Sequence, residues 1–344
     1  MSSKLLSGLP PKVDFAIPEV FNAVIAASNA LARLDEIAQL LENAPVFINT
    51  IPVLEAQASS AIENVVTTHD SIFSADVSSS KPDQETLLAL RLRKAIIIAG
   101  TDVALKRGVS FKLAQLVCSE LMGRQMPLRS KPGTVLVSQG KTVYTPPSPE
   151  HLKELLQDWE RYVNREDVLH PLIVMAISHY QFEAIHPFSD GNGRTGRVLN
   201  VLHLVASGLL NQPVLQMSEY LLRNRDEYYR RLRAVDQSGE WVPWVLFILE
   251  GVRVSALESA QKLKNVTTLQ LTFTERYVAK AALIQLIFEK PYIQIKQVVE
   301  RCGVTRITAN NWLESLVEQG ALTCLSSGRE KFFINKELVA ALKG

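Results

Sequence analysis

Apolar residues recur at intervals of three and four positions over most of the chain, whereas strict alternation of apolar and polar residues is scarce. The first pattern is the period of an amphipathic helix and the second is that of a half-buried strand. The chain is therefore predicted to be all-α, with Pro52 near the start of the second helix, where a proline is tolerated. The predicted helices are 17–44, 53–66, 85–106, 111–122, 149–163, 171–184, 193–207, 226–235 and 242–264.

The helical period is interrupted between Arg124 and Pro147. Two short runs rich in β-branched residues lie on either side of the sequence Ser-Gln-Gly-Lys at 138–141, and this pattern predicts a β-hairpin. A lone hairpin is only marginally stable in water. We therefore expect it to rest on the helices or to pair with another segment.

The pattern changes again after about residue 268. Helices are predicted at 274–288, 295–301 and 305–319, with Gly303 before the last, and β-like runs follow at 322–325 and 331–334. This order of elements is typical of a winged helix-turn-helix. We therefore predict three regions: N-terminal helices at 1–80, a central helical domain at 81–268 and the winged helix-turn-helix at 269–344.

Composition narrows the classes of protein that fit. The chain has 344 residues, of which 47% are hydrophobic and 21% charged, as in folded globular proteins. Its 37 basic and 35 acidic residues give a net charge of +2, which does not favour nucleic acid or membrane as the main partner. The sequence shows neither a secretion signal nor a membrane span. Because Cys118, Cys302 and Cys324 form no disulfide or zinc pattern, we expect a soluble, cytoplasmic protein.

The segment from His186 to Arg197 carries most of the chemical information. Three glycines (Gly191, Gly193 and Gly196) let the backbone approach a ligand closely, and the helix that follows presents free N–H groups to an anion. Arg194 and Arg197 lie one helical turn apart, where two guanidinium groups can hold phosphate oxygens. The pattern predicts a phosphate-binding site.

Two side chains that precede the glycine loop could take part in a reaction. Asp190 has the carboxylate that a divalent cation takes beside a polyphosphate, and His186 is the nearby side chain able to accept a proton near neutral pH. Taken singly, a His-Pro turn, a Gly-Asn-Gly loop or an arginine pair is more often structural. Their joint occurrence at fixed spacing favours transfer of a nucleotide phosphorus group.

The segment satisfies every position of H-x-F-x-[D/E]-G-N-G-R-x-x-R, and the chain resembles the Fic-domain protein adenylyltransferases along nearly its whole length. The resemblance implies ATP bound with Mg²⁺ and transfer of AMP to a Ser, Thr or Tyr hydroxyl of a target protein or of the enzyme itself. It implies His186 as general base, Asp190 as magnesium ligand and Phe188 as a buried anchor. The implied ATP-binding residues are Gly191, Asn192, Gly193, Arg194, Gly196 and Arg197.

The resemblance also covers weaker features. The predicted hairpin matches the family's flap, in which Val135, Leu136 and Val137 would pair with the target segment through the backbone. Asn224 and Tyr228 would line the adenine side of the nucleotide. For these two residues, a helix start and a core-facing tyrosine remain an equal alternative.

An upstream segment fits the family's inhibitory signature, [S/T]-x-x-x-E-[G/N], through Ser59, Glu63 and Asn64. A position N-terminal to the catalytic motif is that of the family's class II members. A glutamate paired with Arg197 would occupy the guanidinium that the γ-phosphate needs, so ATP would bind unproductively. The alternative is a solvent-facing carboxylate on an ordinary helix.

Other activities remain open at this stage. The same site could remove AMP from proteins, or transfer phosphocholine or another nucleotide-derived group. A third alternative is a nucleotide-sensing, DNA-binding regulator, although we favour protein contacts, including a possible homodimer, for the winged region. The residues that would meet DNA are Thr305, Arg306, Asn310 and Asn311 in a groove and Lys296, Arg301, Arg329 and Lys331 at phosphates.

Overall fold

The computed structural model describes residue 6 and residues 8–40, 44–106, 108–138, 141–165, 169–327 and 330–343. Helices dominate these ranges and the strands are few and short, so the all-α prediction is confirmed. Within them, no helix combines the length and the apolar character needed to cross a membrane.

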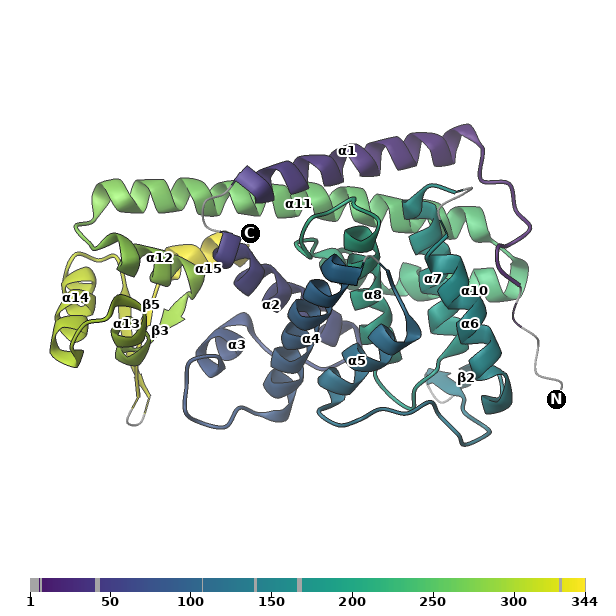
Figure 1. Ribbon diagram of the computed structural model, residues 1–344, viewed down its shortest axis with the longest axis horizontal. Coiled ribbons are helices and arrows are strands. Elements are labelled where there is room, and N and C mark those ends of the chain that lie inside the picture. Colours follow the sequence, from purple (N-terminus) through teal and green to yellow (C-terminus); the bar gives the residue numbers. More distant parts are fainter. Residues whose placement is uncertain are drawn as a thin grey trace.

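Two long helices run side by side along one edge of the molecule (Figure 1). They are α1 (Pro18–Leu40) and α11 (Trp241–Arg276). On α11 the buried residues Ile248, Val252 and Ala256 recur every four positions, which places them on one face of the helix. The helix α11 packs against α1, whose own buried residues include Val20 and Leu31.

The helix α8 (Asn192–Ala206) occupies the centre of the bundle. It is buried on all sides, because five other helices pack around it. Those helices are α2 (Ala44–Ile62), α4 (Gln84–Lys106), α5 (Phe111–Met122), α7 (Pro171–Ile185) and α9 (Met217–Arg223). The bundle is completed by α3 (His69–Ala75), η1 (Pro149–His151), α6 (Leu152–Val163) and α10 (Arg225–Ser238).

The predicted hairpin is present as β1 (Leu136–Ser138) and β2 (Lys141–Tyr144), an antiparallel pair. The turn residues Gln139 and Gly140 lie outside the described residues. Tyr144 donates a hydrogen bond from its hydroxyl to the Ala184 carbonyl at 2.9 Å, so the hairpin rests on the last turn of α7.

The C-terminal region forms the predicted winged helix-turn-helix. Gly303 ends the first helix of the turn motif with a left-handed φ of 65°, and the Thr305 hydroxyl caps the second. The antiparallel sheet has the strand order β3-β5-β4. The elements are α12 (Ala281–Glu289), β3 (Tyr292–Ile293), α13 (Ile295–Cys302), α14 (Arg306–Glu318), β4 (Thr323–Ser327), β5 (Glu330–Ile334) and α15 (Lys336–Lys343).

Several helix boundaries were predicted wrongly: the helix predicted at 17–44 ends at Leu40, that at 53–66 ends at Ile62, and that at 274–288 begins at Ala281. Pro52 lies inside α2, which begins at Ala44, because this part of the helix is buried and its packing outweighs the bond that proline cannot make. The break expected between 264 and 274 does not exist, since α11 continues to Arg276 through a threonine-rich stretch. There Thr267 and Thr272 donate to the carbonyls four residues before them, which satisfies their hydroxyls within the helix. The predicted region boundary at residue 268 therefore falls within α11.

The winged region rests on the segment that follows α2. Tyr292 and Lys343 both donate to the Asp70 carboxylate, at 2.7 and 2.8 Å, and Lys290 lies 3.3 Å from that of Asp76. Glu330 at the start of β5 accepts hydrogen bonds from residues 78 and 79. These contacts place the C-terminal region against α3, only a few residues beyond Glu63.

Candidate active site

The inhibitory segment ends α2 in a defined helix-capping motif. The N–H of Val65 donates to the Ser60 carbonyl and that of Asn64 to the Ala61 carbonyl, both at 3.0 Å. This is the Schellman pattern, in which the residue after the helix cap is left-handed. Asn64 has a φ of 61° and occupies this position, and glycine and asparagine are the residues that adopt it most readily. The signature therefore asks for Gly or Asn after Glu63 because the backbone at this position is left-handed.

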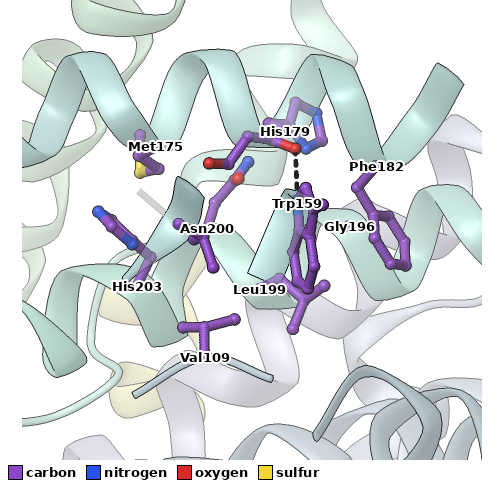
Figure 2. Close-up of a pocket in the computed structure, with 11 residues that line it drawn as sticks. Val109, Trp159, Met175, His179, Phe182, Gly196, Leu199, Asn200 and His203 are labelled. Atoms are coloured by element: carbon purple, nitrogen blue, oxygen red, sulfur yellow. Dashed lines mark hydrogen bonds between the residues drawn. The ribbon is translucent and has the colours of Figure 1, made fainter. Parts of the chain in front are cut away.

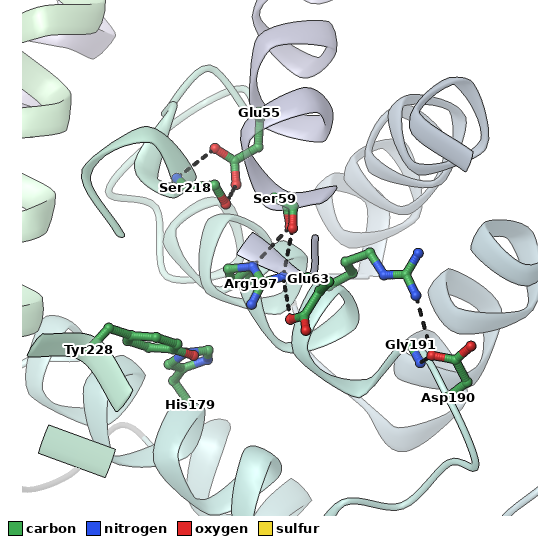
Figure 3. Close-up of polar contacts among 10 residues, drawn as sticks. Glu55, Ser59, Glu63, His179, Asp190, Gly191, Arg197, Ser218 and Tyr228 are labelled. Carbon is green, nitrogen blue, oxygen red and sulfur yellow. Dashed lines mark hydrogen bonds and ion pairs between the residues drawn. The ribbon is translucent and has the colours of Figure 1, made fainter. Parts of the chain in front are cut away.

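The capping motif places Glu63 on Arg197 (Figure 3). Glu63 Oε1 lies 2.9 Å from Arg197 Nη2. The same guanidinium donates to the Ser59 hydroxyl and to the Ser59 carbonyl, each at 2.9 Å. Arg197 is only 2% exposed. Burial acts to lower the pKa of Arg197, but Glu63 and other neighbours raise it by more, so the net shift of this pKa is upward. The structure thus brings Glu63 onto Arg197, the pairing that the sequence predicted, and adds Ser59 as a second partner of the same guanidinium.

The loop before α8 has the features of an anion site. Gly191 caps the helix with a φ of 80°, and the N–H groups of the first turn follow it. Arg194 is buried, and its Nε and Nη1 have no hydrogen-bond partner in the described structure. Unpaired buried guanidinium groups are costly, so an anion that supplies acceptors fits this position.

Two predicted phosphate contacts have packing functions in the structure. The Asn192 side chain exchanges two 2.9 Å hydrogen bonds with the backbone of Phe188, so this side chain holds the loop together. Gly196 lies against Glu183 and Phe182 of α7, where a Cβ would overlap the Glu183 carboxylate. Gly193 faces the site instead, because a Cβ there would overlap Glu63 Oε1.

Asp190 is the candidate metal ligand. Its side chain is 58% exposed, and its Oδ1 accepts from the Gly191 N–H at 2.6 Å and lies 3.3 Å from Arg194 Nη2. Among the described residues, no group of three or more His, Cys, Asp and Glu side chains is placed to hold a metal. One accessible carboxylate beside a phosphate site fits Mg²⁺, which takes its other ligands from phosphate and water.

His186 ends α7 in a strained conformation. Its φ is 50°, and its carbonyl accepts from Arg129 Nε at 2.8 Å. Arg129 is buried and also donates to the carbonyls of Pro147 and Ile185. It therefore joins the end of α7 to the irregular segment that follows the hairpin, a link that the sequence analysis missed because these residues are far apart in the chain.

The environment of His186 keeps its imidazole neutral. Burial, followed by the positive charge of Arg129, lowers the pKa of His186 to about 4. A neutral imidazole can accept a proton, as a general base must.

This pKa predicts an unusual pH profile for any reaction that uses His186 as base. Protonation is expected to inactivate it only near pH 4, so kcat/KM should stay flat as the pH falls from about 8 to about 5.5. Initial rates measured across this range, with circular dichroism at each pH to verify folding, check the prediction. A rate that halves near pH 6.5 would contradict it.

The hairpin presents a partly exposed edge. Val135 is 44% exposed just before β1, and the pairing of β1 with β2 is irregular between Leu136 and Val137. The side chain of Val137 lies outside the described part of the structure. The backbone positions predicted to dock a target segment are thus on the hairpin, whereas target binding remains a prediction.

Of the two residues predicted to line the adenine side of the nucleotide, Tyr228 lies in the core instead. Asn224 is half-buried at the start of α10 and donates to the Tyr220 carbonyl at 2.9 Å. Tyr228 is buried, with its hydroxyl 2.9 Å from His179 Nε2, and thus matches the core-facing alternative (Figure 3). The next residue, Tyr229, is half-buried within electrostatic reach of Glu63 and Arg197, and Arg225 lies over its ring.

A small cavity lies between α6, α7 and α8 (Figure 2). Its lining is mostly apolar and includes Trp159, Leu199 and His203. None of His186, Arg194 or Arg197 lines it, so it is separate from the candidate phosphate site.

Most of the candidate DNA-contacting cations are already paired. Lys296 lies 3.7 Å from Glu300 and Arg301 lies 3.1 Å from Glu289, while Lys331 bonds Glu314. Arg329 lies outside the described residues. Thr305, Arg306, Asn310 and Asn311 lie at the start of α14, within the helix predicted at 305–319.

The conformation of Asn64 leads to a prediction. Asn64→Val should destabilise the end of α2 by about 1–2 kcal/mol, because a β-branched residue resists the left-handed conformation. Asn64→Gly should be tolerated, since only its exposed hydrogen bond from Arg225 is lost. Thermal unfolding of both variants checks this, and equal stability of the two would contradict it.

Comparison with known proteins places this geometry in a family. The model of the Fic/DOC family matches residues 109–204, and that of the Fic/DOC family N-terminal region matches residues 21–100. The model of the C-terminal domain of SoFic-like protein adenylyltransferases matches residues 265–338.

Individual relatives agree with these matches. The protein adenylyltransferases Fic of Drosophila erecta and Drosophila melanogaster are each 38% identical over 109 residues, which is 31% of this chain. The match spans only 21% of the length of these relatives.

Solved structures share the fold. A Fic family protein from Desulfovibrio desulfuricans G20 has a TM-score of 0.58 at 23% identity, over 92% of this chain and 96% of that one. Fic-1 of C. elegans (residues 134–508) has a TM-score of 0.56 at 23% identity, over 72% of this chain and 74% of that one. The fold, the complete motif and three family models in the same order lead to one conclusion: the chain belongs to the Fic/DOC family.

Proposed function

We propose that the protein is an adenylyltransferase that moves AMP from ATP to a hydroxyl of a target protein or of itself, and that Glu63 inhibits it. The observation that carries the proposal is the contact of Glu63 with Arg197, at 2.9 Å, beside an anion loop with a second arginine. A carboxylate on this guanidinium keeps the γ-phosphate of ATP away from it, which is how an inhibitory residue would act. The names of the Drosophila relatives support the same activity.

The residues of the site have separate functions in this reaction. Arg194 and the first N–H groups of α8 bind the phosphates, and Arg197 holds the γ-phosphate once Glu63 has left. The target hydroxyl attacks the α-phosphorus, its proton passes to His186, and the bond to the departing pyrophosphate breaks. The backbone of the β1–β2 hairpin holds the target segment beside His186.

Mg²⁺ would be held by Asp190 together with phosphate oxygens, and it would neutralise charge that builds up on the leaving pyrophosphate. The single accessible carboxylate supports this assignment. Because Asp190 also touches Arg194 and the Gly191 N–H, the same residue links the cation to the anion loop.

Donor competition tests the choice of nucleotide. Labelled AMP transfer from ATP by Glu63→Gly is measured in the presence of excess unlabelled ATP, GTP, UTP or CDP-choline. We expect unlabelled ATP to suppress the signal far more than the other three. Stronger suppression by another nucleotide would contradict ATP as the preferred donor.

Removal of AMP is the second candidate activity. It is favoured by the 33% exposure of the Glu63 side chain, which leaves its second carboxylate oxygen room to orient a water molecule. In that case Glu63→Gly would lose activity on an AMP-modified protein, whereas an inhibited transferase gains activity. The same variant thus separates the two reactions.

We propose a cytoplasmic location, supported by the three free cysteines. The paired cations of the winged region support protein contacts, such as a homodimer, over DNA as its function. Sedimentation of the full chain, with and without duplex DNA, distinguishes these partners.

A further inference from the structure

A second glutamate of α2 lies on the same face as the inhibitory residues. Glu55, Ser59 and Glu63 are spaced four residues apart, so they form one line along the helix (Figure 3). Ser59 and Glu63 contact Arg197 directly. Glu55 lies two turns earlier and contacts a different part of the bundle.

Glu55 is fixed by two hydrogen bonds from one residue. Its Oε2 accepts from the Ser218 backbone N–H at 2.9 Å, and its Oε1 accepts from the Ser218 hydroxyl. Glu55 is 3% exposed and Ser218 is completely buried. Both carboxylate oxygens are therefore satisfied by the first turn of α9, away from solvent.

The position of this contact is what makes it informative. The helix α9 leads directly to Asn224 and α10, the segment that carries Tyr229 beside Arg197. The Glu55–Ser218 contact therefore joins the inhibitory helix to the part of the bundle that borders the candidate nucleotide site. A shift of α2 along its axis would break this contact and the Glu63–Arg197 contact together.

Burying the carboxyl group of Glu55 at this position costs free energy of folding. Burial raises the pKa of Glu55 to about 7, although the bonds from Ser218 and the charge of Arg197 act in the opposite direction. An apolar residue would fill the same space without this cost. Buried polar contacts of this kind are best known for fixing the register of packed helices.

We propose that Glu55 is a positioning residue that holds α2 in the register at which Glu63 meets Arg197. The inference deepens the proposed function, because it concerns regulation of the same site. Loss of the Glu55–Ser218 contact loosens α2, Glu63 leaves Arg197 for a larger fraction of the time, and the γ-phosphate gains its guanidinium.

The test compares binding of ATP and ADP, which does not depend on any transfer activity. Isothermal titration calorimetry with Mg²⁺ gives the ratio of the two affinities for the wild type, Glu55→Ala, Glu63→Gly and the double variant. We expect Glu55→Ala to raise the preference for ATP by about fivefold or more, in the range of ordinary coupling between sites. In the Glu63→Gly background the same substitution should add less than about twofold, because both changes free the same arginine.

Two further variants separate positioning from general loosening of the helix. Glu55→Gln keeps an oxygen for the Ser218 N–H and an amide that can bond the hydroxyl, so it should behave like the wild type. Leu54→Ala removes a completely buried neighbour on α2 that is not bonded to Ser218, and thermal unfolding of each variant measures the loss of stability. The Leu54→Ala variant should leave the preference for ATP over ADP unchanged.

The outcomes are distinct. An unchanged ATP preference in folded Glu55→Ala overturns the proposal, as does an equal gain in Leu54→Ala. If Glu55→Ala does not fold, Ser218→Ala replaces it, since it removes only the hydroxyl donor and should give a smaller gain in the same direction. A Glu63→Gly protein that prefers ATP but transfers no AMP would reject the proposed function and leave this inference standing.

Discussion

Glu63→Gly is expected to raise the initial rate of AMP transfer from ATP by roughly 10- to 150-fold. The substitution removes the carboxylate 2.9 Å from Arg197 and frees a buried guanidinium for the γ-phosphate. A hydrogen bond to a charged group contributes about 1.5–3 kcal/mol, and this range converts to the expected change in rate. The measurement is the initial rate of label incorporation from α-labelled ATP.

The control for this variant is Glu19→Gly, which removes a carboxylate from the first turn of α1. It should leave transfer unchanged. An unaltered rate for Glu63→Gly, with ATP still bound, would show that Glu63 does not limit the enzyme. A fall in the rate on an AMP-modified substrate would instead favour removal of AMP.

His186→Ala is expected to lower AMP transfer by about 10²- to 10⁴-fold, the usual contribution of a general base. ATP affinity should remain close to that of the parent, because the phosphates are held by α8 and its arginines and not by this side chain. Transfer rates and ATP affinity are measured in the Glu63→Gly background, where activity is highest.

The matched control is His151→Ala, a partly exposed histidine in the short η1 helix. It should retain full transfer. A His186→Ala protein that loses ATP binding in parallel with activity would contradict the assignment of a base and indicate a structural residue. The backbone of His186 is held by Arg129 and does not depend on the imidazole, so folding should be retained.

The sequence predicted much of the fold and of the site because its strongest signals are local. The helical period placed α5, α7 and α8 to within about two residues. The motif at the junction of α7 and α8 placed Arg194 and Arg197 one helical turn apart and Asp190 just before the helix, since their spacing alone determines this. The signature around Glu63 was equally informative because a helix cap is a local structure.

Contacts between distant segments were harder to predict. Glu55 reads in the sequence as an ordinary helix carboxylate, and only the packing of α9 shows that it is buried against Ser218. Arg129 belongs to a stretch without periodicity, yet three carbonyl groups surround it. The spacing of residues along one helix carries no information about such partners.

Tertiary packing also overrode local propensity. Pro52 would normally mark a helix start, but α2 begins eight residues earlier. The apolar pattern predicted a break between 264 and 274, whereas α11 continues through this stretch, with Val266 and Phe273 buried. For Tyr228, the buried partners His179 and Trp244 lie on other helices, so its place in the core was not visible from its own segment.

The most direct test of the central claim compares α-labelled with γ-labelled ATP. Each is incubated with Mg²⁺ and cell lysate, together with the wild type, Glu63→Gly or Glu63→Gly/His186→Ala. The account predicts protein-bound label from α-labelled ATP alone, stronger with Glu63→Gly than with the wild type and lost with the double variant. Label from γ-labelled ATP that depends on the added protein, or no label from either nucleotide with Glu63→Gly, would contradict it.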